Sequence, residues 1–299
     1  MTDVHDAAPE TLSDTRPMYW SIRRELWENR TIYGAPLVVA IVVLFGCVIN
    51  TMMLPHRMPR LLAADAAKQR VAIEGPYDTA AGLMCVTAVL VGLFYCLDAP
   101  HGERRDRSVL FWKSLPVSDR VTVLSKASIP LVVLPLYALA IAIAIQINIL
   151  LLSNAVLIGN GPGLAAVWTH VKFVQSWIAL TYGIVAITLW HAPVYAWLLL
   201  VSGWARRAPL LWAVFPPLAI CALEKMAFNS TYFAKFIGYR FVGWFQQAFI
   251  VHKGGRVVDP LAAMTPGRFL ATPGLWVGLI FAAACLALAI RLRRYRDAI

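Results

Sequence analysis

Residues 98–120 of this chain read DAPHGERRDRSVLFWKSLPVSDR, a charged segment with an apolar patch that lies between two runs without a charged residue. The first run covers residues 79–97, and the second begins at residue 127. A helix needs about 20 apolar residues to cross the ~30 Å hydrocarbon core of a bilayer, and both runs are close to or above this length. The pattern therefore predicts two membrane-spanning helices that are joined by a charged loop.

The composition of the whole chain favours the same class. Of its 299 residues, 60% are hydrophobic and 14% are charged, whereas soluble domains carry about 25% charged residues. The formal net charge of +11 is explained by Lys and Arg residues that flank the spans and face anionic lipid, so no nucleic-acid partner is expected. The five cysteines lie in or beside the apolar runs without the spacing of a metal site, which is typical of small buried hydrophobic residues.

Six apolar runs are long enough to cross a membrane, so the predicted fold class is an all-α integral membrane protein with six transmembrane helices. The predicted spans are residues 32–54, 79–97, 127–152, 173–205, 208–228 and 269–290. The fourth run exceeds the length of one perpendicular span, and a kink at Pro193, a tilt or protruding ends would accommodate it. Residues 1–17 lack an apolar stretch, which predicts a disordered cytoplasmic tail rather than a signal peptide.

An even number of spans places both termini on one side of the membrane. The segments on that side hold more Lys and Arg residues than the segments on the other side, including Arg206, Arg207 and the basic cluster after residue 290. Because cytoplasmic segments carry an excess of basic residues, both termini are predicted to be cytoplasmic.

Two further segments are amphipathic and are not expected to span. Residues 18–30 place apolar side chains on one helical face, widened by Trp20 and Trp27, which predicts an interfacial helix on the inner leaflet. The polar side chains on the opposite face are Ser21, Arg24, Glu25 and Glu28. In residues 231–249, aromatic side chains are interrupted by charged and amide side chains, which favours an outer-surface or re-entrant helix.

The sequence contains no motif that indicates an enzyme. It has no G-x-x-x-x-G-K-[ST] phosphate-binding loop and no H-E-x-x-H, C-x-x-C or G-x-S-x-G motif. The six histidines are scattered over different segments. No catalytic, cofactor-binding or metal-binding residue is therefore predicted in this chain.

Two ionisable residues lie within apolar runs, where a charge costs about 2.5 to 3.5 kcal/mol and tends to face protein or water. His191 is in the middle of the fourth run, and Glu224 is near the end of the fifth. Both are candidates for a translocation path. The alternatives are a neutral His191 that donates to a backbone carbonyl freed by Pro193, and a Glu224 that is hydrated or ion-paired at the outer interface.

The loop between the second and third spans combines charge with an apolar ridge. Its basic residues precede an apolar stretch at residues 109–112, and Leu115 and Pro116 are expected to end the short helix. Such a helix beneath the membrane can dock into a groove on a cytosolic domain, or it can rest on lipid as an ordinary connector. The candidate interface residues are Glu103, Arg104, Arg105, Arg107, Leu110, Phe111, Trp112 and Leu115.

In these features the chain resembles an ABC-2-type permease, the membrane subunit of a bacterial ABC exporter. The loop matches the family's charged cluster at residues 103–108, its apolar stretch at 109–112 and its Ser-Leu-Pro-Val-Ser at 114–118. Residues 20–26 resemble the elbow helix, and residues 198–209 resemble the turn between spans four and five. Arg107 and Ser108 stand where many members have Gly-Thr. The topology match covers residues 18–299.

The resemblance implies a fold, a location and partners. Members have a cytoplasmic elbow helix, six spans and a coupling helix between the second and third spans, and lie in the bacterial cytoplasmic membrane. They pair with a second permease copy or a paralogue and bind two separate ATPase subunits, which hold the ATP and Mg. On this basis the chain forms the translocation path and performs no hydrolysis itself.

Two other classes are possible from the residues alone. A secondary transporter or channel that needs no ATPase would favour ionisable residues at mid-membrane in several spans and an internal repeat. Only His191 is clearly central, and no repeat is visible. An integral-membrane enzyme would need clustered histidines and carboxylates, and no spacing in this sequence indicates one.

Overall fold

The computed structural model describes residues 15–105, 117–158, 163, 165, 167, 168, 172–250 and 260–295. Apart from an isolated bridge between Phe249 and Met264, these residues form helices and their connections, with no strand among them. Six helical segments are long and apolar enough to cross a membrane, which confirms the predicted all-α, membrane-helical class. These segments are Thr31–Met52, Lys68–Arg105, Asp119–Val156, Phe173–Trp204, Pro209–Phe228 and Pro273–Tyr295.

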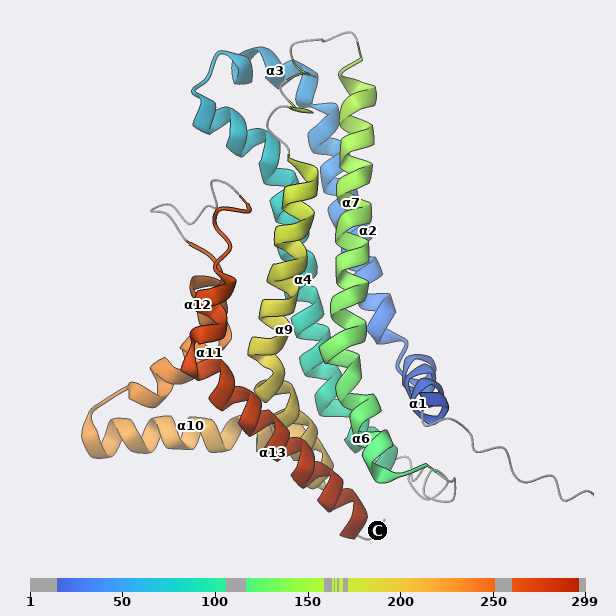
Figure 1. The fold of residues 1–299 in the computed structure, drawn as a ribbon, viewed down its shortest axis with the longest axis vertical. Helices are drawn as coiled ribbons and strands as arrows, with labels where there is room; N and C mark the ends of the chain where they lie inside the picture. The colour runs from blue at the N-terminus through green and yellow to red at the C-terminus, as the bar shows by residue number, and fades with distance from the viewer. Residues whose placement is uncertain are drawn as a thin grey trace, which may run out of the picture.

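The helices follow the order of the predicted runs. In chain order they are α1 (Thr15–Glu28), α2 (Thr31–Met52), α3 (Leu54–Leu62), α4 (Ala66–Arg105), α6 (Asp119–Ser128), η1 (Ile129–Val133), α7 (Leu134–Val156), α9 (Phe173–Trp204), α10 (Pro209–Phe228), α11 (Tyr232–Ala248), α12 (Pro266–Ala271) and α13 (Pro273–Tyr295). The helices α2, α4, α7 and α9 run side by side along the long axis, and α13 crosses α9 obliquely (Figure 1). The helix α9 contacts α4, α7, α10, α11 and α13, so it is the centre of the bundle.

The second run belongs to a helix about twice as long as predicted. The apolar run ends at Leu97, but α4 continues to Arg105 and begins at Ala66. An ion pair between Arg70 and Glu74, with 2.9 Å between nitrogen and oxygen, supports the early turns, as expected for side chains four residues apart. A prediction from hydropathy ends the helix at the first charged residue. Charged residues are nevertheless compatible with a helix, so α4 continues beyond that point. The extension places Glu103 in the last turn of α4.

The third run is interrupted by one turn of π-helix. Between α6 and α7, the segment η1 contains Pro130, and Pro135 follows in the first turn of α7. Proline lacks an amide hydrogen and crowds the preceding carbonyl, which explains why the regular hydrogen-bond ladder fails here. Gly92 of α4 lies opposite, and a Cβ on it would be 3.1 Å from the Tyr195 ring and 3.3 Å from Pro130 Cβ. The bulge therefore packs tightly into the bundle.

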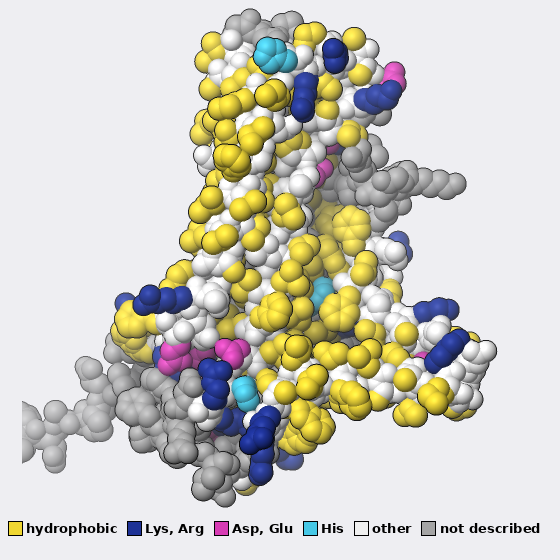
Figure 2. Space-filling model, turned by 180° about the vertical axis from the view of Figure 1, so that it is seen from behind, with side chains coloured by type: hydrophobic (Ala, Val, Ile, Leu, Met, Phe, Trp, Pro, Cys, Tyr) yellow, Lys and Arg dark blue, Asp and Glu magenta, His cyan; other side chains and the backbone are white. Residues whose placement is uncertain are grey.

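The fifth run forms α10, which lies across the long axis and extends away from the bundle (Figure 1). Its only buried residue is Ala213, whose carbonyl accepts a hydrogen bond from Trp197 Nε1 at 3.3 Å. Large apolar side chains along it are exposed, up to 84% for Met226. Hydrophobic side chains also cover the bundle wall and the underside of this arm in Figure 2. The run is helical as predicted, and its orientation could not be derived from hydropathy.

The last run is divided by Pro273 into the short α12 and the long α13. Pro273 lacks an amide donor, so a new helix starts there. The amphipathic segment at residues 231–249 forms α11, as a helix that is not among the six candidate spans. The fourth run continues through Pro193 as the single helix α9.

Candidate functional site

The polar face of α1 is directed into the protein. Ser21 is buried, and the Glu25 side chain is 0% exposed, whereas Trp20 and Trp27 are 57% and 68% exposed. The amphipathic helix is therefore present, but its polar face packs against α6 and the end of α4. A pattern of polar residues on one helical face is usually assigned to solvent, and here it marks an internal contact.

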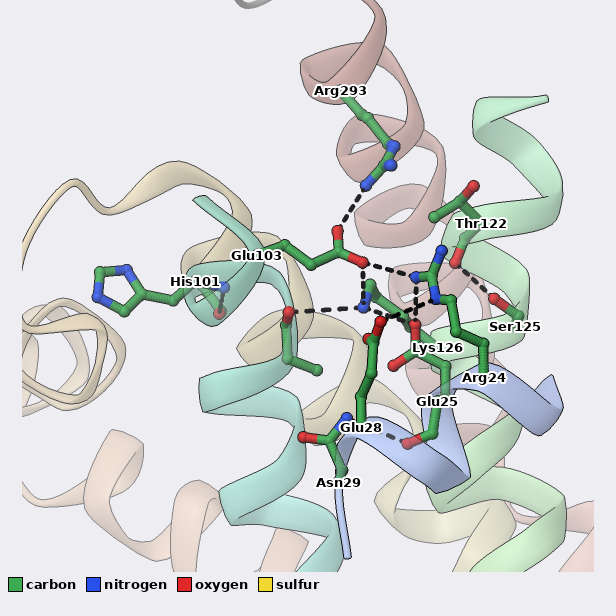
Figure 3. A network of polar contacts seen from close by, with 12 residues as sticks. Arg24, Glu25, Glu28, Asn29, His101, Glu103, Thr122, Ser125, Lys126 and Arg293 are labelled. Carbon is green, nitrogen blue, oxygen red and sulfur yellow. Dashed lines mark hydrogen bonds and ion pairs between the residues drawn. The ribbon is translucent and has the colours of Figure 1, made fainter. Parts of the chain in front are cut away.

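Glu25 is the centre of a buried ion-pair junction (Figure 3). Its Oε1 accepts a hydrogen bond from Lys126 Nζ at 2.8 Å and from Arg24 Nη2 at 2.9 Å. Its Oε2 accepts a hydrogen bond from the Tyr95 hydroxyl at 2.8 Å. Both carboxylate oxygens are thus satisfied, as burial of a charge requires. These contacts join α1 to α4 and α6.

Glu103 is the second buried carboxylate of the junction. Its Oε1 lies 2.7 Å from Arg24 Nη2 and 3.0 Å from Lys126 Nζ. Its Oε2 accepts a hydrogen bond from Arg293 Nη1 at 3.0 Å (Figure 3). Since Arg293 is in the last turns of α13, the junction brings together the N-terminal helix, the end of α4, the start of the third span and the C-terminal helix.

Arg293 also binds the other side of the loop. Its Nε lies 3.2 Å from Asp119 Oδ1, in the first turn of α6. Glu103 and Asp119 therefore flank residues 106–116, and one guanidinium binds both. The two ends of the predicted coupling segment are held together by the C-terminal helix.

The carboxylates of Glu25, Glu28 and Glu103 are close enough to share a metal ion, with ligand atoms within 4.8 Å of one another. Lys126 and Arg24 already lie at hydrogen-bond distance from Glu25 and Glu103, and Arg24 Nε lies 3.6 Å from Glu28 Oε1. These cations neutralise the carboxylates, so the arrangement is an ion-pair network and we assign no metal to it. Burial raises the pKa of the Glu28 carboxyl above its usual range, and the charge of Arg24 opposes this rise.

Arg104 and Ser202 connect the end of α4 to the end of α9. Arg104 Nη2 donates to the carbonyls of Ser202 and Ala205, the second at 2.8 Å. The Ser202 hydroxyl donates to the Leu97 carbonyl at 2.6 Å and accepts from the His101 amide at 3.2 Å, so it is inserted into a turn of α4. The end of α4 that is predicted to face the cytoplasm is thus bound to α9 as well as to the ion-pair junction.

The structure describes three of the eight predicted coupling residues. Glu103 is buried in the junction, Arg104 binds the end of α9, and Arg105 is exposed at the end of α4. The other predicted residues, Arg107, Leu110, Phe111, Trp112 and Leu115, lie outside the described residues, as does the predicted coupling helix that contains them. Contact of any of the eight with a partner stays a prediction.

His191 is 2% exposed in the middle of α9, and its Nδ1 lies 2.8 Å from the Ile187 carbonyl. The expected hydrogen bond to a backbone carbonyl is present, but the acceptor is not the carbonyl of Leu189, which Pro193 leaves without its amide partner. Rings of Tyr195 and Phe241 lie next to the imidazole. This burial favours a structural role for His191, as a histidine bonded to a backbone carbonyl, over a position in a translocation path.

Glu224 and His191 are not brought together. Glu224 is in the last turns of α10, where its Oε1 accepts hydrogen bonds from the Ser230 hydroxyl and the Tyr232 amide, both at 2.6 Å. Its Oε2 accepts one from the Phe233 amide at 2.8 Å. The carboxylate therefore caps the start of α11 and fixes the corner between the two helices.

Replacing Glu224 with alanine is expected to loosen the first turn of α11, because the amides of Tyr232 and Phe233 lose their acceptor. Hydrogen exchange at these two amides should rise severalfold, and Glu224→Gln, which keeps one acceptor oxygen, should show a smaller rise. Unchanged exchange together with loss of transport would favour the translocation-path hypothesis instead.

Sequence reasoning missed Glu25, Tyr95, Lys126, Asp119 and Arg293 as parts of one site. In the sequence, Lys126 and Arg293 are two of the basic residues that flank predicted spans, and Glu25 is part of a polar helical face. Lys126 is separated from Glu25 by 101 residues, and Arg293 from Glu103 by 190. The one local signal was the position of Lys126, which immediately precedes an uncharged run.

Comparison of the chain with protein-family models, with curated proteins and with solved structures gave no match.

Proposed function

We propose that this chain is the permease subunit of an ATP-driven ABC transporter, of the ABC-2 type and acting as an exporter. It forms the translocation path with a second permease copy or a paralogue in the bacterial cytoplasmic membrane. Two separate ATPase subunits, which hold the ATP and Mg, engage residues 106–116. In this arrangement α1 is the elbow helix, and both termini are cytoplasmic.

The observation that carries the proposal is the attachment to the bundle of the two residues that flank positions 106–116. Glu103 and Asp119, on either side of this segment, both bind Arg293. Glu103 also binds Arg24 of α1 and Lys126 of α6. A force applied to the segment would reach four helices through ion pairs, which is what a permease driven by a separate motor requires. An ordinary connector resting on lipid needs no such attachment.

The π-helical turn connects the ion-pair junction to the part of the bundle that is predicted to lie in the membrane. The segment η1 follows α6 directly and packs against α4 and α9 beside Gly92. Interruptions of this kind are frequent at functional sites and at hinges. We infer that α6 moves with the junction, and that η1 is the point where α6 and α7 change their relative orientation.

The proposal is tested by purifying the full-length protein in a mild detergent and searching for a bound nucleotide-binding subunit. An ATPase that co-purifies in a ratio of about one per permease chain is the expected result. Transport by the chain alone in proteoliposomes, with no ATPase present, would favour the secondary transporter or channel.

A double replacement in the predicted coupling helix is expected to separate insertion from coupling. Trp112→Ala with Leu115→Ala removes the apolar side chains predicted to dock into the ATPase, so most of the permease-stimulated ATPase activity should be lost. The amount of protein in the membrane should stay near that of the unmodified chain. Full stimulation by the double variant would count heavily against this docking surface.

A further inference from the structure

The outward face of α1 is aromatic because its polar face is used inside the protein. Tyr19, Trp20 and Trp27 are exposed, while Glu25 on the opposite side is buried in the junction. The Tyr19 and Trp20 rings contact each other edge to face, with centroids 5.5 Å apart. Exposed indole and phenol rings of this kind are typical of the headgroup level of a membrane, where one edge meets apolar chains and the other meets water.

Arg23 lies between the two exposed indoles. Its guanidinium carbon is 5.3 Å from the centroid of the Trp20 ring and 4.9 Å from that of the Trp27 ring. The spacing of three and four residues places all three side chains on one side of the helix. Among the described residues no carboxylate lies within ion-pair distance of Arg23. The guanidinium can therefore offer its hydrogen-bond donors to an external anion.

The helix that follows α1 is uncharged along its whole length, and α1 lies at its lower end (Figure 1). The helix α2 begins at Thr31, three residues after α1 ends, and contains no charged residue. Val38, Ile41 and Phe45 on it are exposed by 61% or more. A cation held between aromatic rings at the foot of an exposed apolar helix matches a molecule with a phosphate at one end and acyl chains at the other. A free phosphate ion matches this surface less well, because it has no apolar part that could contact the exposed side chains of α2.

We propose that Arg23, Trp20 and Trp27 form a binding site for the phosphate headgroup of an anionic phospholipid, whose acyl chains lie along α2. The planar guanidinium donates to phosphate oxygens in pairs, and the two indoles hold its plane in position. The site anchors α1, and through Glu25 the ion-pair junction, to the charge of the adjoining leaflet. Binding of the lipid at this site requires neither a bound ATPase nor transport.

The test is a lipid titration of the full-length protein in a neutral detergent, with retained lipid counted by native mass spectrometry. The probes are dioleoyl phosphatidylglycerol, dioleoyl phosphatidylcholine and inorganic phosphate. The unmodified protein should retain phosphatidylglycerol in preference to phosphatidylcholine. Arg23→Gln should weaken phosphatidylglycerol binding about fivefold, the effect of one basic residue at an anionic surface. The affinity of Arg23→Lys for phosphatidylglycerol should lie between those of the unmodified protein and Arg23→Gln, because lysine keeps the charge but not the paired donors.

The matched control is Arg206→Gln, which removes an exposed arginine from the turn between α9 and α10. Its phosphatidylglycerol binding should equal that of the unmodified protein. Trp20→Leu keeps the apolar surface but removes one ring, and should weaken binding as Arg23→Gln does. Melting temperatures in neutral detergent should be the same for all four variants, because none of the replaced side chains belongs to the buried ion-pair junction.

Three results would overturn the site. The first is equal retention of both lipids by the unmodified protein. The second is the same loss of binding in Arg206→Gln as in Arg23→Gln, which would indicate a general charge effect. The third is displacement of phosphatidylglycerol by inorganic phosphate at a similar concentration, which would leave no role for the acyl chains.

Discussion

Replacing Lys126 with methionine is expected to lower the free energy of unfolding by about 3–5 kcal/mol. Lys126 is buried and donates to Glu25 at 2.8 Å, and its Nζ lies 3.0 Å from Glu103. Methionine is similar in length but has no charge, so two buried carboxylates lose a shared cation. Arg24 still binds both carboxylates and Arg293 still binds Glu103, but the buried negative charges are then balanced by one cation fewer, which is costly in a protein interior. The melting temperature in mild detergent, compared with that of the unmodified protein, measures the loss.

Two variants of α1 show whether the loss comes from the excess of buried negative charge. Adding Glu25→Gln to Lys126→Met removes one of these negative charges, so the double variant should recover part of the stability. Glu28→Gln is the matched control on the same helix. The raised pKa of Glu28 means that the folded protein favours the protonated carboxyl. Protonation of Glu28 therefore stabilises the folded protein below the pKa that this carboxyl has in the unfolded chain. This stabilisation is lost as the pH rises through the higher pKa of Glu28 in the folded protein.

Above that folded pKa, removal of the Glu28 charge should leave stability unchanged or slightly raised. A pH series of melting temperatures for Glu28→Gln and the unmodified protein tests this sign. If Lys126→Met melted at the same temperature as the unmodified protein, the junction would not stabilise the fold, and its role in holding the helices together would be excluded.

Arg293→Gln is expected to reduce permease-stimulated ATPase activity roughly tenfold while membrane insertion stays near normal. Arg293 joins the two sides of residues 106–116 through Glu103 at 3.0 Å and Asp119 at 3.2 Å. Without it, Glu103 and Asp119 lose their shared contact with α13, so motion of the ATPase should be transmitted less well to the bundle. A tenfold change in rate corresponds to about 1.4 kcal/mol of activation free energy.

The matched control for this prediction is Arg291→Gln. Arg291 is two residues earlier on α13 and is exposed, so its replacement removes the same charge without touching the junction. Stimulation should stay near the unmodified level in this variant. Reconstitution with the partner ATPase in proteoliposomes, with equal amounts of permease, gives the comparison. Equal stimulation by the Arg291 and Arg293 variants would show that the ion pairs to Glu103 and Asp119 do not transmit motion.

The helical runs of this chain could be predicted from sequence because length and apolarity are local properties. The runs at 32–54 and 208–228 match α2 and α10 to within two residues at each end. The true ends of α4 could not be predicted by the same rule, because the charged residues up to Arg105 continue the helix after the apolar run has ended. The division of the last run at Pro273 had a local signal, the proline itself.

The site was less accessible to sequence analysis, for a physical reason. The contact of Glu103 with Arg293 depends on how α4 and α13 cross, and no periodicity within either helix encodes this crossing. Glu25 lies on a polar helical face, and such a face is equally compatible with contact with water and with contact with another helix. The polar face of a helix beside a membrane span can therefore be an internal contact that binds buried charges such as Lys126.

Attachment of this chain to a motor can be measured with a photo-crosslinking amino acid in place of Trp112 in intact cells, followed by mass spectrometry of the crosslinked partner. We expect an adduct with a nucleotide-binding ATPase, and we expect no such adduct when the crosslinker replaces the exposed Trp276 on α13. An adduct with proteins outside the cytoplasm, or no ATPase adduct from position 112, would contradict the claim that residues 106–116 connect this membrane protein to a motor.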